Sequence, residues 1–296
     1  MGRVLFIGPG RVGLALGYAL WQADVADALT YCGRRPEPPS HPVFGQGTAE
    51  WHFGLRAPRP DERAVVLAVP DDVLPEMAHA LAGHGPPPSG TVALHTAGGL
   101  GPDVLAPLHA VGYSVGTFHP LQPILHPVFG ADRLEGSGFL VSGERGARAV
   151  AQRWVAALGG HALDVPASRR PMAHAALGLA ANGAMALMAV AVEALARSGV
   201  DPDVARAAVG PLVRGTVEEV ERRGFAEGLS GSLGAGDSEA VGLHLRALEG
   251  DARELYRLVG RLAVDAAIDE GRSIDELGAL HALLQSPGGT RESEST

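Results

Sequence analysis

A glycine-rich turn near the start of the chain constrains its fold more than any other feature. An apolar run from Val4 to Ile7, typical of a strand buried on both faces, leads directly into Gly8-Pro9-Gly10-Arg11-Val12-Gly13. Residues 14–20 then place apolar side chains at helical spacing. A G-x-G-x-x-G turn between a strand and a helix is where a dinucleotide fold receives a pyrophosphate. The pattern therefore predicts a nucleotide site here rather than a merely structural turn.

Each glycine of this turn has a predicted task. Gly8 permits the tight bend, Gly10 lets the backbone approach the pyrophosphate, and Gly13 lets helix and strand pack closely. The N-terminus of the following helix then faces the phosphates. Pro9, Arg11 and Val12 complete the predicted cofactor-binding turn.

Two arginines at the end of the second predicted strand indicate which dinucleotide binds. Residues 28–32 read as a strand that ends in Gly33-Arg34-Arg35, with no acidic residue there. At this position an acid selects NAD, whereas arginine accepts the 2'-phosphate of NADP. The sequence therefore predicts NADP(H), held by Gly33, Arg34 and Arg35. The alternative is that both arginines are ordinary solvated side chains.

Strands alternate with helices over the first 165 residues. Further strands are predicted at residues 64–69, 91–95, 113–118 and 138–142, with helices at 73–81 and 147–158 and with Asp71-Asp72 placed to start the first of these helices. This alternation predicts an α/β fold with a doubly wound, Rossmann-type parallel sheet. The strand ends should line the cofactor crevice with Val69, Pro70, Thr96 and Gly98.

The pattern changes to helices alone over residues 166–286. One long, apolar central helix is predicted at 171–198, and the next begins at Asp201-Pro202 and is interrupted at Gly210-Pro211. A glycine-rich loop at 224–236 precedes a helix starting at Asp237, a helix at 251–271 and a final helix. Residues 287–296 are polar, and we expect them to be disordered.

Composition excludes several classes of function. The net charge of -9 argues against a nucleic-acid partner, and Cys32, the single cysteine, allows no internal disulfide. All 24 Lys and Arg positions are arginine, which excludes every mechanism that needs a lysine amine. No histidine pair has convincing metal spacing. We expect no charge-free apolar run long enough to span a membrane and no signal peptide, and therefore a cytoplasmic protein.

Several sequence blocks together resemble one family. They are residues 6–13, His95-Thr96-Ala97-Gly98, His119-Pro120-Leu121-Gln122-Pro123, His174-Ala175-Ala176 with Asn182, and Gly236-Asp237 with His244-Leu245. The chain is similar to proteins of the 6-phosphogluconate dehydrogenase-like superfamily that join a Rossmann-like domain to a domain of unknown function 2520. Some members are regarded as alternative ketopantoate reductases that use NADPH, so the resemblance implies that activity.

One departure from the family pattern concerns the substrate. Relatives usually carry an Arg-Gly-Asp segment where this chain has Ala235-Gly236-Asp237. If that arginine holds a substrate carboxylate, this chain either recruits another, such as Arg214 or Arg246, or prefers a different substrate.

Reduction of a ketone leaves an alkoxide that must be protonated, so the site needs an acid or a strong hydrogen-bond donor. His119 follows a strand predicted to end at the crevice, and His174 and Asn182 share one face of the long helix. Asp237 is a further candidate, although a plain N-cap explains it equally well. His119, His174, Asn182 and Asp237 are therefore the candidate catalytic residues, with His119 or His174 as proton donor.

Three hypotheses follow from these candidates. The first is an NADPH-dependent reductase of a small 2-keto acid. The second is a reductase of a cyclic imine, for which the carboxylate of Asp237 matters most, and the third is an NADP(H)-binding module without turnover. We also expect a homodimer, because the helix at 171–198 is too apolar to lie exposed and in this superfamily such helices pack against a second subunit.

Overall fold

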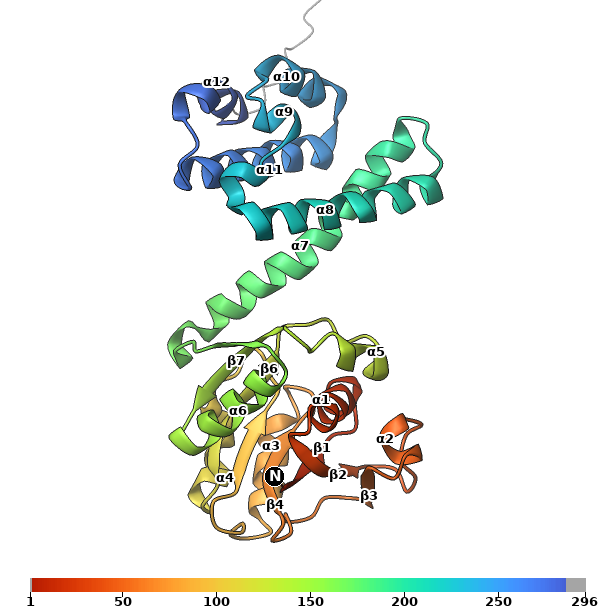
Figure 1. Cartoon of the computed structure of the whole chain (residues 1–296), viewed down its shortest axis with the longest axis vertical. Coiled ribbons are helices and arrows are strands. Elements are labelled where there is room, and N and C mark those ends of the chain that lie inside the picture. The colour runs from red at the N-terminus through yellow and green to blue at the C-terminus, as the bar shows by residue number, and fades with distance from the viewer. Residues whose placement is uncertain (1, 286–296) are drawn as a thin grey trace, which may run out of the picture. The chain divides into compact units, whose positions relative to one another are not determined.

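The computed structural model describes residues 2–285 and consists of two compact units (Figure 1). The first unit ends at Ala181 and the second begins at Asn182. This division falls inside the long helix, whereas the sequence pattern placed the domain boundary before it, at residue 165. The predicted disorder of residues 287–296 lies outside the described residues.

The first unit is built on one sheet, which has eight strands within residues 2–285. The strands in chain order are β1 Gly2–Ile7, β2 Ala26–Gly33, β3 Ala49–Phe53, β4 Glu62–Leu67, β5 Val92–His95, β6 Ser114–Pro120, β7 Gly138–Gly143 and β8 His161–Leu163. Their order in the sheet is β3-β2-β1-β4-β5-β6-β7-β8, with every described pair parallel except β6 with β7. The doubly wound sheet is thus confirmed. It is parallel-dominated rather than wholly parallel, and β3 and β8 were not predicted.

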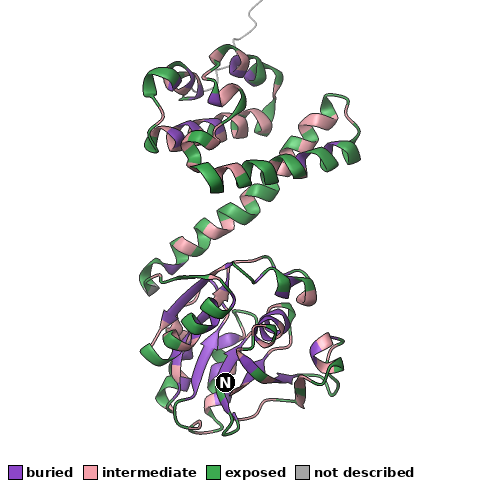
Figure 2. Ribbon diagram, viewed as in Figure 1, coloured by how far each residue is buried: buried purple, intermediate pink, exposed green. Residues whose placement is uncertain are grey.

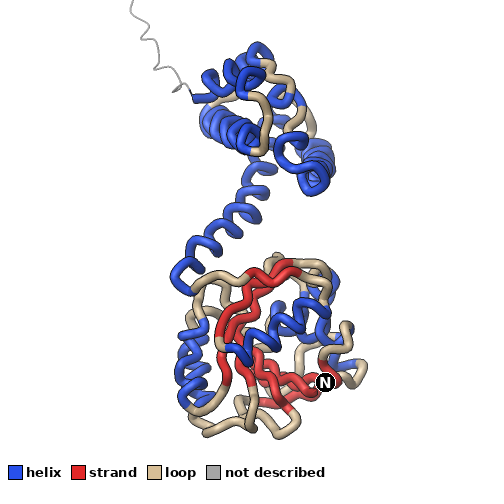
Figure 3. Tube along the Cα trace, turned by 60° about the vertical axis from the view of Figure 1, so that its left-hand side comes forward, coloured by secondary structure: helices blue, strands red, loops and turns tan. Residues whose placement is uncertain are grey.

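Helices cover both faces of this sheet, as Figure 3 shows. The helices of the first unit are α1 Arg11–Gln22, α2 Pro42–Gly45, α3 Leu74–Ala82, α4 Ala106–Ala110, α5 Pro127–Asp132 and α6 Arg145–Ala157, with short 3-10 turns at Pro102–Leu105 and Ala167–Arg169. Side chains alternate along each strand, so Phe6 packs with α1 and α6 while Leu5 packs with α3 and α4. Both faces of the sheet are buried under helices, which explains why the strand sequences are continuously apolar rather than alternating. The helix α3 begins without a side-chain cap, so Asp71 and Asp72 do not start it as expected.

The second unit is helical. It contains the C-terminal part of α7 Arg170–Arg197, followed by α8 Pro202–Gly228, α9 Gly231–Gly234, α10 Ser238–Ala247, α11 Gly250–Asp269 and α12 Ile274–Gln285. Its small core joins α10, α11 and α12 through Val241, Val264 and Leu280. Asp201 caps α8 as predicted, accepting hydrogen bonds from the backbone N–H groups of Asp203 and Val204.

The predicted interruption at Gly210-Pro211 is wrong. Helix α8 continues through Pro211 and breaks at Gly224 instead, where φ is +78°. Glycine adopts this left-handed backbone without the steric penalty of a Cβ. After the break, Glu270 accepts hydrogen bonds from the backbone N–H groups of Phe225 and Ala226, so its carboxylate caps the restarted helical turn. The segment 224–236 is therefore largely helical rather than a loop.

The long helix α7 is exposed along almost its whole length (Figure 2). Among its described side chains only Arg170 is buried, and Met172, Leu179 and Met185 are each about two-thirds or more exposed. The expectation about apolar runs is wrong here, because residues 171–192 contain no Asp, Glu, Lys or Arg. By length and composition α7 could cross a membrane, although one such helix is weak support for that. Exposed apolar surface of this extent is typical of interaction sites.

Candidate active site

The glycine turn leaves open space at the middle glycine alone. Gly8 has φ +100°, and a Cβ there would lie 2.4 Å from the carbonyl oxygen of Ala68. A Cβ on Gly13 would lie 2.3 Å from the carbonyl oxygen of Gly8. By contrast, nothing lies within 4 Å of a Cβ on Gly10. The outer glycines are thus required by packing, while the backbone at Gly10 is free to meet a ligand.

A cavity of about 630 Å³ opens beside this turn. The predicted residues that line it are Gly8, Pro9, Gly10, Gly33, Arg34, Arg35, Val69 and Pro70. Both arginine side chains are exposed at the cavity. The five other predicted cofactor residues do not line it: Arg11, Val12 and Gly13 belong to the first turn of α1, and Thr96 and Gly98 follow β5.

Trp51 also lines this cavity and was missed by the sequence analysis. Its ring lies against Gly33, where a Cβ would approach a ring carbon to 2.1 Å, and its Nε1–H donates to the carbonyl oxygen of Pro36 at 2.8 Å. The segment after Arg35 is rich in proline and reads as a loop, so β3 was not anticipated. The alternation of Ala49, Trp51 and Phe53 is the period-two signal that could have revealed it.

The predicted histidines His119 and His174 lie together, on β6 and α7. Their ring centroids are 5.8 Å apart. Gly98 lies between them, because a Cβ there would be 2.5 Å from Nδ1 of His174 and 2.8 Å from Cε1 of His119. A larger residue at this position would force the rings apart. His119 and Pro120 are part of β6 rather than of a turn that follows the strand, which corrects the sequence-based placement.

His119 is held in one orientation by Thr96. Its Nδ1–H donates to the carbonyl oxygen of Thr96 across 2.7 Å, the tautomer being assigned from this hydrogen bond. Burial, followed by the charges of His174 and Arg170, holds the pKa of His119 below its ordinary value, while the hydrogen bond to Thr96 and the carboxylate of Asp71 act in the opposite direction. His119 is therefore predominantly neutral at pH 7, with the Nε2 lone pair available to a ligand.

His95 belongs to the interior, as expected from its position in the strand. It is fully buried, its Nε2 bonds the carbonyl oxygen of Gly101 at 3.0 Å, and its Nδ1 accepts from the N–H of Ala97. Burial lowers the pKa of His95 to about 4. This neutral ring therefore fixes the start of the loop that carries Gly98.

Arg170 is the second residue that the sequence analysis missed. This first residue of α7 is fully buried in the first unit, and its Nη1 donates to the hydroxyl oxygens of Thr117 and Ser142 at 3.2 and 2.8 Å. In a sequence, an arginine just before an apolar helix is normally interpreted as a solvated side chain at the helix end. The burial of Arg170 is therefore visible only in the folded structure.

Asn182 and Asp237 belong to the second unit, and their participation in the site stays a prediction. Asn182 is exposed on α7, two turns beyond His174. Asp237 caps α10, because its carboxylate accepts a hydrogen bond from the N–H of Ala240 at 2.9 Å. His244 bonds the hydroxyl of Tyr256 at 2.8 Å.

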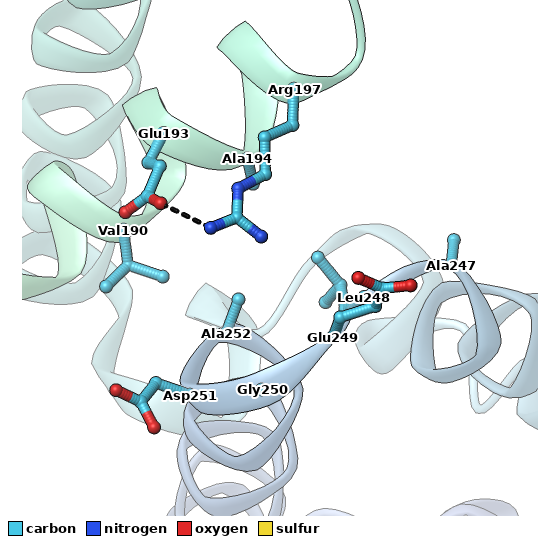
Figure 4. Close-up of a pocket in the computed structure, with 10 residues that line it drawn as sticks. All are labelled: Val190, Glu193, Ala194, Arg197, Ala247, Leu248, Glu249, Gly250, Asp251 and Ala252. Atoms are coloured by element: carbon cyan, nitrogen blue, oxygen red, sulfur yellow. Dashed lines mark hydrogen bonds and ion pairs between the residues drawn. The ribbon is translucent and has the colours of Figure 1, made fainter.

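A smaller cavity of about 330 Å³ lies in the second unit, between the end of α7 and the start of α11 (Figure 4). Its arginine, Arg197, is already paired with Glu193 at 2.7 Å, and Glu249 and Asp251 add two further carboxylates. The pairing leaves no free cation for an anionic ligand. No group of three or more metal-ligating side chains occurs among the described residues.

Comparisons with known proteins identify both parts of the chain. Residues 57–120 match the family model of a Rossmann-like domain, and residues 137–263 match that of a domain of unknown function 2520. The two matches confirm the resemblance indicated by the sequence blocks. A search of curated proteins finds no match.

Solved structures share the fold over most of the chain at low identity. Protein TM1727 from Thermotoga maritima matches with a TM-score of 0.69 and 18% identity over 91% of this chain and 100% of that one. A pyrroline carboxylate reductase from Plasmodium falciparum, with NADP bound, matches with a TM-score of 0.60 and 17% identity over 94% of this chain and 98% of that one. An NADH-preferring ketol-acid reductoisomerase from an uncultured archaeon matches with a TM-score of 0.61 and 16% identity over 91% of this chain and 84% of that one. At these identities the likeness establishes the fold alone.

Proposed function

We propose that this chain, which belongs to the family joining a Rossmann-like domain to a domain of unknown function 2520, is an NADPH-dependent reductase of a small 2-keto acid. The observation that carries the proposal is the cavity in which an unobstructed Gly10 backbone and the guanidinium groups of Arg34 and Arg35 come together. Open backbone suits a pyrophosphate, and the guanidinium groups suit the 2'-phosphate.

The reaction requires one hydride and one proton. NADPH, when bound, supplies the hydride to the carbonyl carbon of the substrate, and the C=O electron pair moves to oxygen. A protonated histidine, His119 or His174, gives that oxygen its proton and regains one from solvent. The products are the 2-hydroxy acid and NADP⁺. Because Gly98 has no side chain, the two rings can lie close enough together for either one to reach the same substrate oxygen.

The neighbouring structures support a reductase and leave two substrate classes to compare. One neighbour is named a pyrroline carboxylate reductase and another a ketol-acid reductoisomerase. The cyclic-imine alternative relies on the carboxylate of Asp237, which caps the N-terminus of α10 in this structure. A module that binds NADP(H) without turnover is the third possibility to test.

NADPH oxidation by the purified protein tests this proposal. We expect turnover with ketopantoate or a related 2-keto acid and weaker turnover with pyrroline-5-carboxylate. Faster reduction of the imine would favour the second hypothesis. NADPH binding with no oxidation across both substrate classes would leave only the non-catalytic module.

Replacing both Arg34 and Arg35 with alanine tests the assignment of the cofactor. We expect the Kd for NADPH to rise about 100-fold or more, because two charge-assisted hydrogen bonds, each contributing roughly 1.5–3 kcal/mol, are lost. The Kd for NADH should stay within about twofold, since NADH lacks the 2'-phosphate. Arg145→Ala, an exposed arginine on α6, is the control. Equal weakening of both nucleotides would contradict the assignment.

We further propose that the protein is a homodimer that covers α7. This helix is apolar on all sides, and Arg170 is its only buried residue among those described. A helix of this kind needs a partner surface, and a second copy of the chain supplies the same apolar helix by symmetry. A cytoplasmic dimer would therefore bury α7 without a membrane.

Light scattering in aqueous buffer tests the dimer. We expect twice the mass of the chain, and Leu179→Glu, which places a charge on the exposed face of α7, should shift the protein toward the monomer. Leu125→Glu changes an equally exposed leucine in a loop of the first unit and serves as control. A wild-type monomer at working concentration, or a protein extracted only with detergent, would contradict the proposal.

A further inference from the structure

A buried arginine without a carboxylate lies beside the histidine pair. Arg170 is 0% exposed, and of its three nitrogen atoms only Nη1 has hydrogen-bond partners, the hydroxyls of Thr117 and Ser142. Nε and Nη2 are buried without a partner. Among the described residues no Asp or Glu forms an ion pair with it. A buried cation left in this state is costly, so proteins normally supply an anion nearby.

Local geometry places this cation next to the histidines. Thr117 and His119 are two residues apart on β6, so their side chains leave the same face of the sheet. Ser142 pairs directly with Thr117 across β6 and β7, so it shares that face. Arg170 and His174 are four residues apart on α7, so they share one face of the helix. Two contacts therefore join β6 to α7, one from Arg170 to Thr117 and one between the histidine rings.

Two of the three ionisable groups that act on His119 carry a positive charge when protonated. The groups that act on it are His174 and Arg170 from α7 and Asp71 from the loop after β4. His95, on the neighbouring strand, also experiences the charge of Arg170. Asp71 is exposed, so its effect is screened by water, whereas the charge of Arg170 acts through a buried, low-dielectric region.

We propose that Arg170 gives the His119–His174 site an uncompensated positive charge, and that this charge selects anionic substrates whose reduction develops negative charge on oxygen. The inference rests on the proposed function and narrows its substrate class. A 2-keto acid is an anion and becomes an alkoxide when hydride adds to its carbonyl carbon, so its charge becomes more negative during the reaction. The iminium group of a protonated cyclic imine is positive and loses its charge on reduction, so a fixed cation near the reacting carbon opposes its binding there even when the substrate also carries a carboxylate. Arg170 is therefore a positioning residue that acts through the field at His119.

Ligand binding read by NMR tests this inference without any turnover. The imidazole Cε1–H resonances of His119 and His174, identified from the spectra of His119→Gln and His174→Gln, are followed while the protein, with no nucleotide added, is titrated with oxalate or with pyrrolidinium. Oxalate stands for the substrate anion and pyrrolidinium for the cyclic cation. We expect oxalate to shift both resonances and pyrrolidinium to shift neither.

Two substitutions connect the preference to Arg170. Arg170→Met removes the charge and keeps an unbranched side chain, and we expect it to weaken oxalate binding at least 10-fold and to raise the pKa at which His119 titrates. Arg170→Lys keeps the charge, and we expect it to retain oxalate binding and the pKa of His119 largely unchanged. A change in packing alone would not distinguish the two variants in this way.

The outcomes separate the inference from the proposed function. Binding of pyrrolidinium to the wild type, or oxalate binding that is unchanged in Arg170→Met, overturns the inference. If Arg170→Met fails to fold, the wild-type comparison of oxalate with pyrrolidinium still decides it. Failure of NADPH oxidation would reject the reductase while leaving this binding experiment valid.

Discussion

Replacing Gly10 with valine should greatly weaken NADPH binding while leaving the fold intact. Nothing lies within 4 Å of a Cβ at this position, and the backbone there, with φ −79°, is open to any L residue. The valine side chain would therefore occupy the space in which the pyrophosphate approaches the backbone. We expect the Kd for NADPH to rise about 100-fold or more, a loss of at least ~2.7 kcal/mol in binding free energy. Calorimetric titration measures it.

Gly45→Val is the matched control for this substitution. Gly45 lies in α2, also has open space around a Cβ and has no left-handed φ. We expect the control to bind NADPH like the wild type, and both variants to unfold at nearly the wild-type temperature. Wild-type NADPH affinity in Gly10→Val would show that no pyrophosphate lies against this turn.

Replacing His119 with glutamine should lower kcat for keto-acid reduction about 100- to 10,000-fold, the usual contribution of a general acid. Because the pKa of His119 is held below its ordinary value, only a minority of molecules carry the proton at pH 7. Reduction in the wild type should therefore quicken as the pH falls, with an inflection below about 6.5. The reverse oxidation needs the neutral ring, so its rate should rise with pH and level off above that inflection.

The pH profile of the variant separates His119 from its neighbour. Glutamine does not titrate, so the inflection should disappear in His119→Gln. His84→Gln, which changes an exposed histidine after α3, should keep both rate and profile. If the inflection persists in His119→Gln with kcat within threefold of the wild type, the proton donor is another group, and His174 becomes the first candidate.

Local sequence patterns predicted much of the first unit and two helix starts in the second. The glycine turn between an apolar strand and an apolar helix appears as β1 and α1, and Asp201 and Asp237 cap the helices that follow them. These features depend on residues close together in the chain, whose backbone preferences do not need the rest of the fold. The same reasoning failed at Pro211, because a long helix packed at other points tolerates one proline.

Trp51 and Arg170, which the sequence analysis missed, depend on long-range contacts instead. Trp51 reaches the cavity only because β3 pairs with β2, and this short strand follows a segment rich in proline. Arg170 is buried only because the start of α7 packs against Thr117 and Ser142, which lie 53 and 28 residues away in sequence. No local pattern distinguishes a buried arginine of this kind from a solvated one, so the sequence analysis named Arg214 and Arg246, and not Arg170, as arginines that this chain could recruit for a substrate carboxylate.

The most direct test of the central claim is calorimetric titration of the purified wild-type protein with NADPH and with NADH. The turn at Gly10 and the guanidinium groups of Arg34 and Arg35 predict one NADPH site per chain, with NADPH bound at least about 10-fold more tightly than NADH. Binding of neither nucleotide would contradict the account, because the cavity beside the glycine turn would then have another occupant.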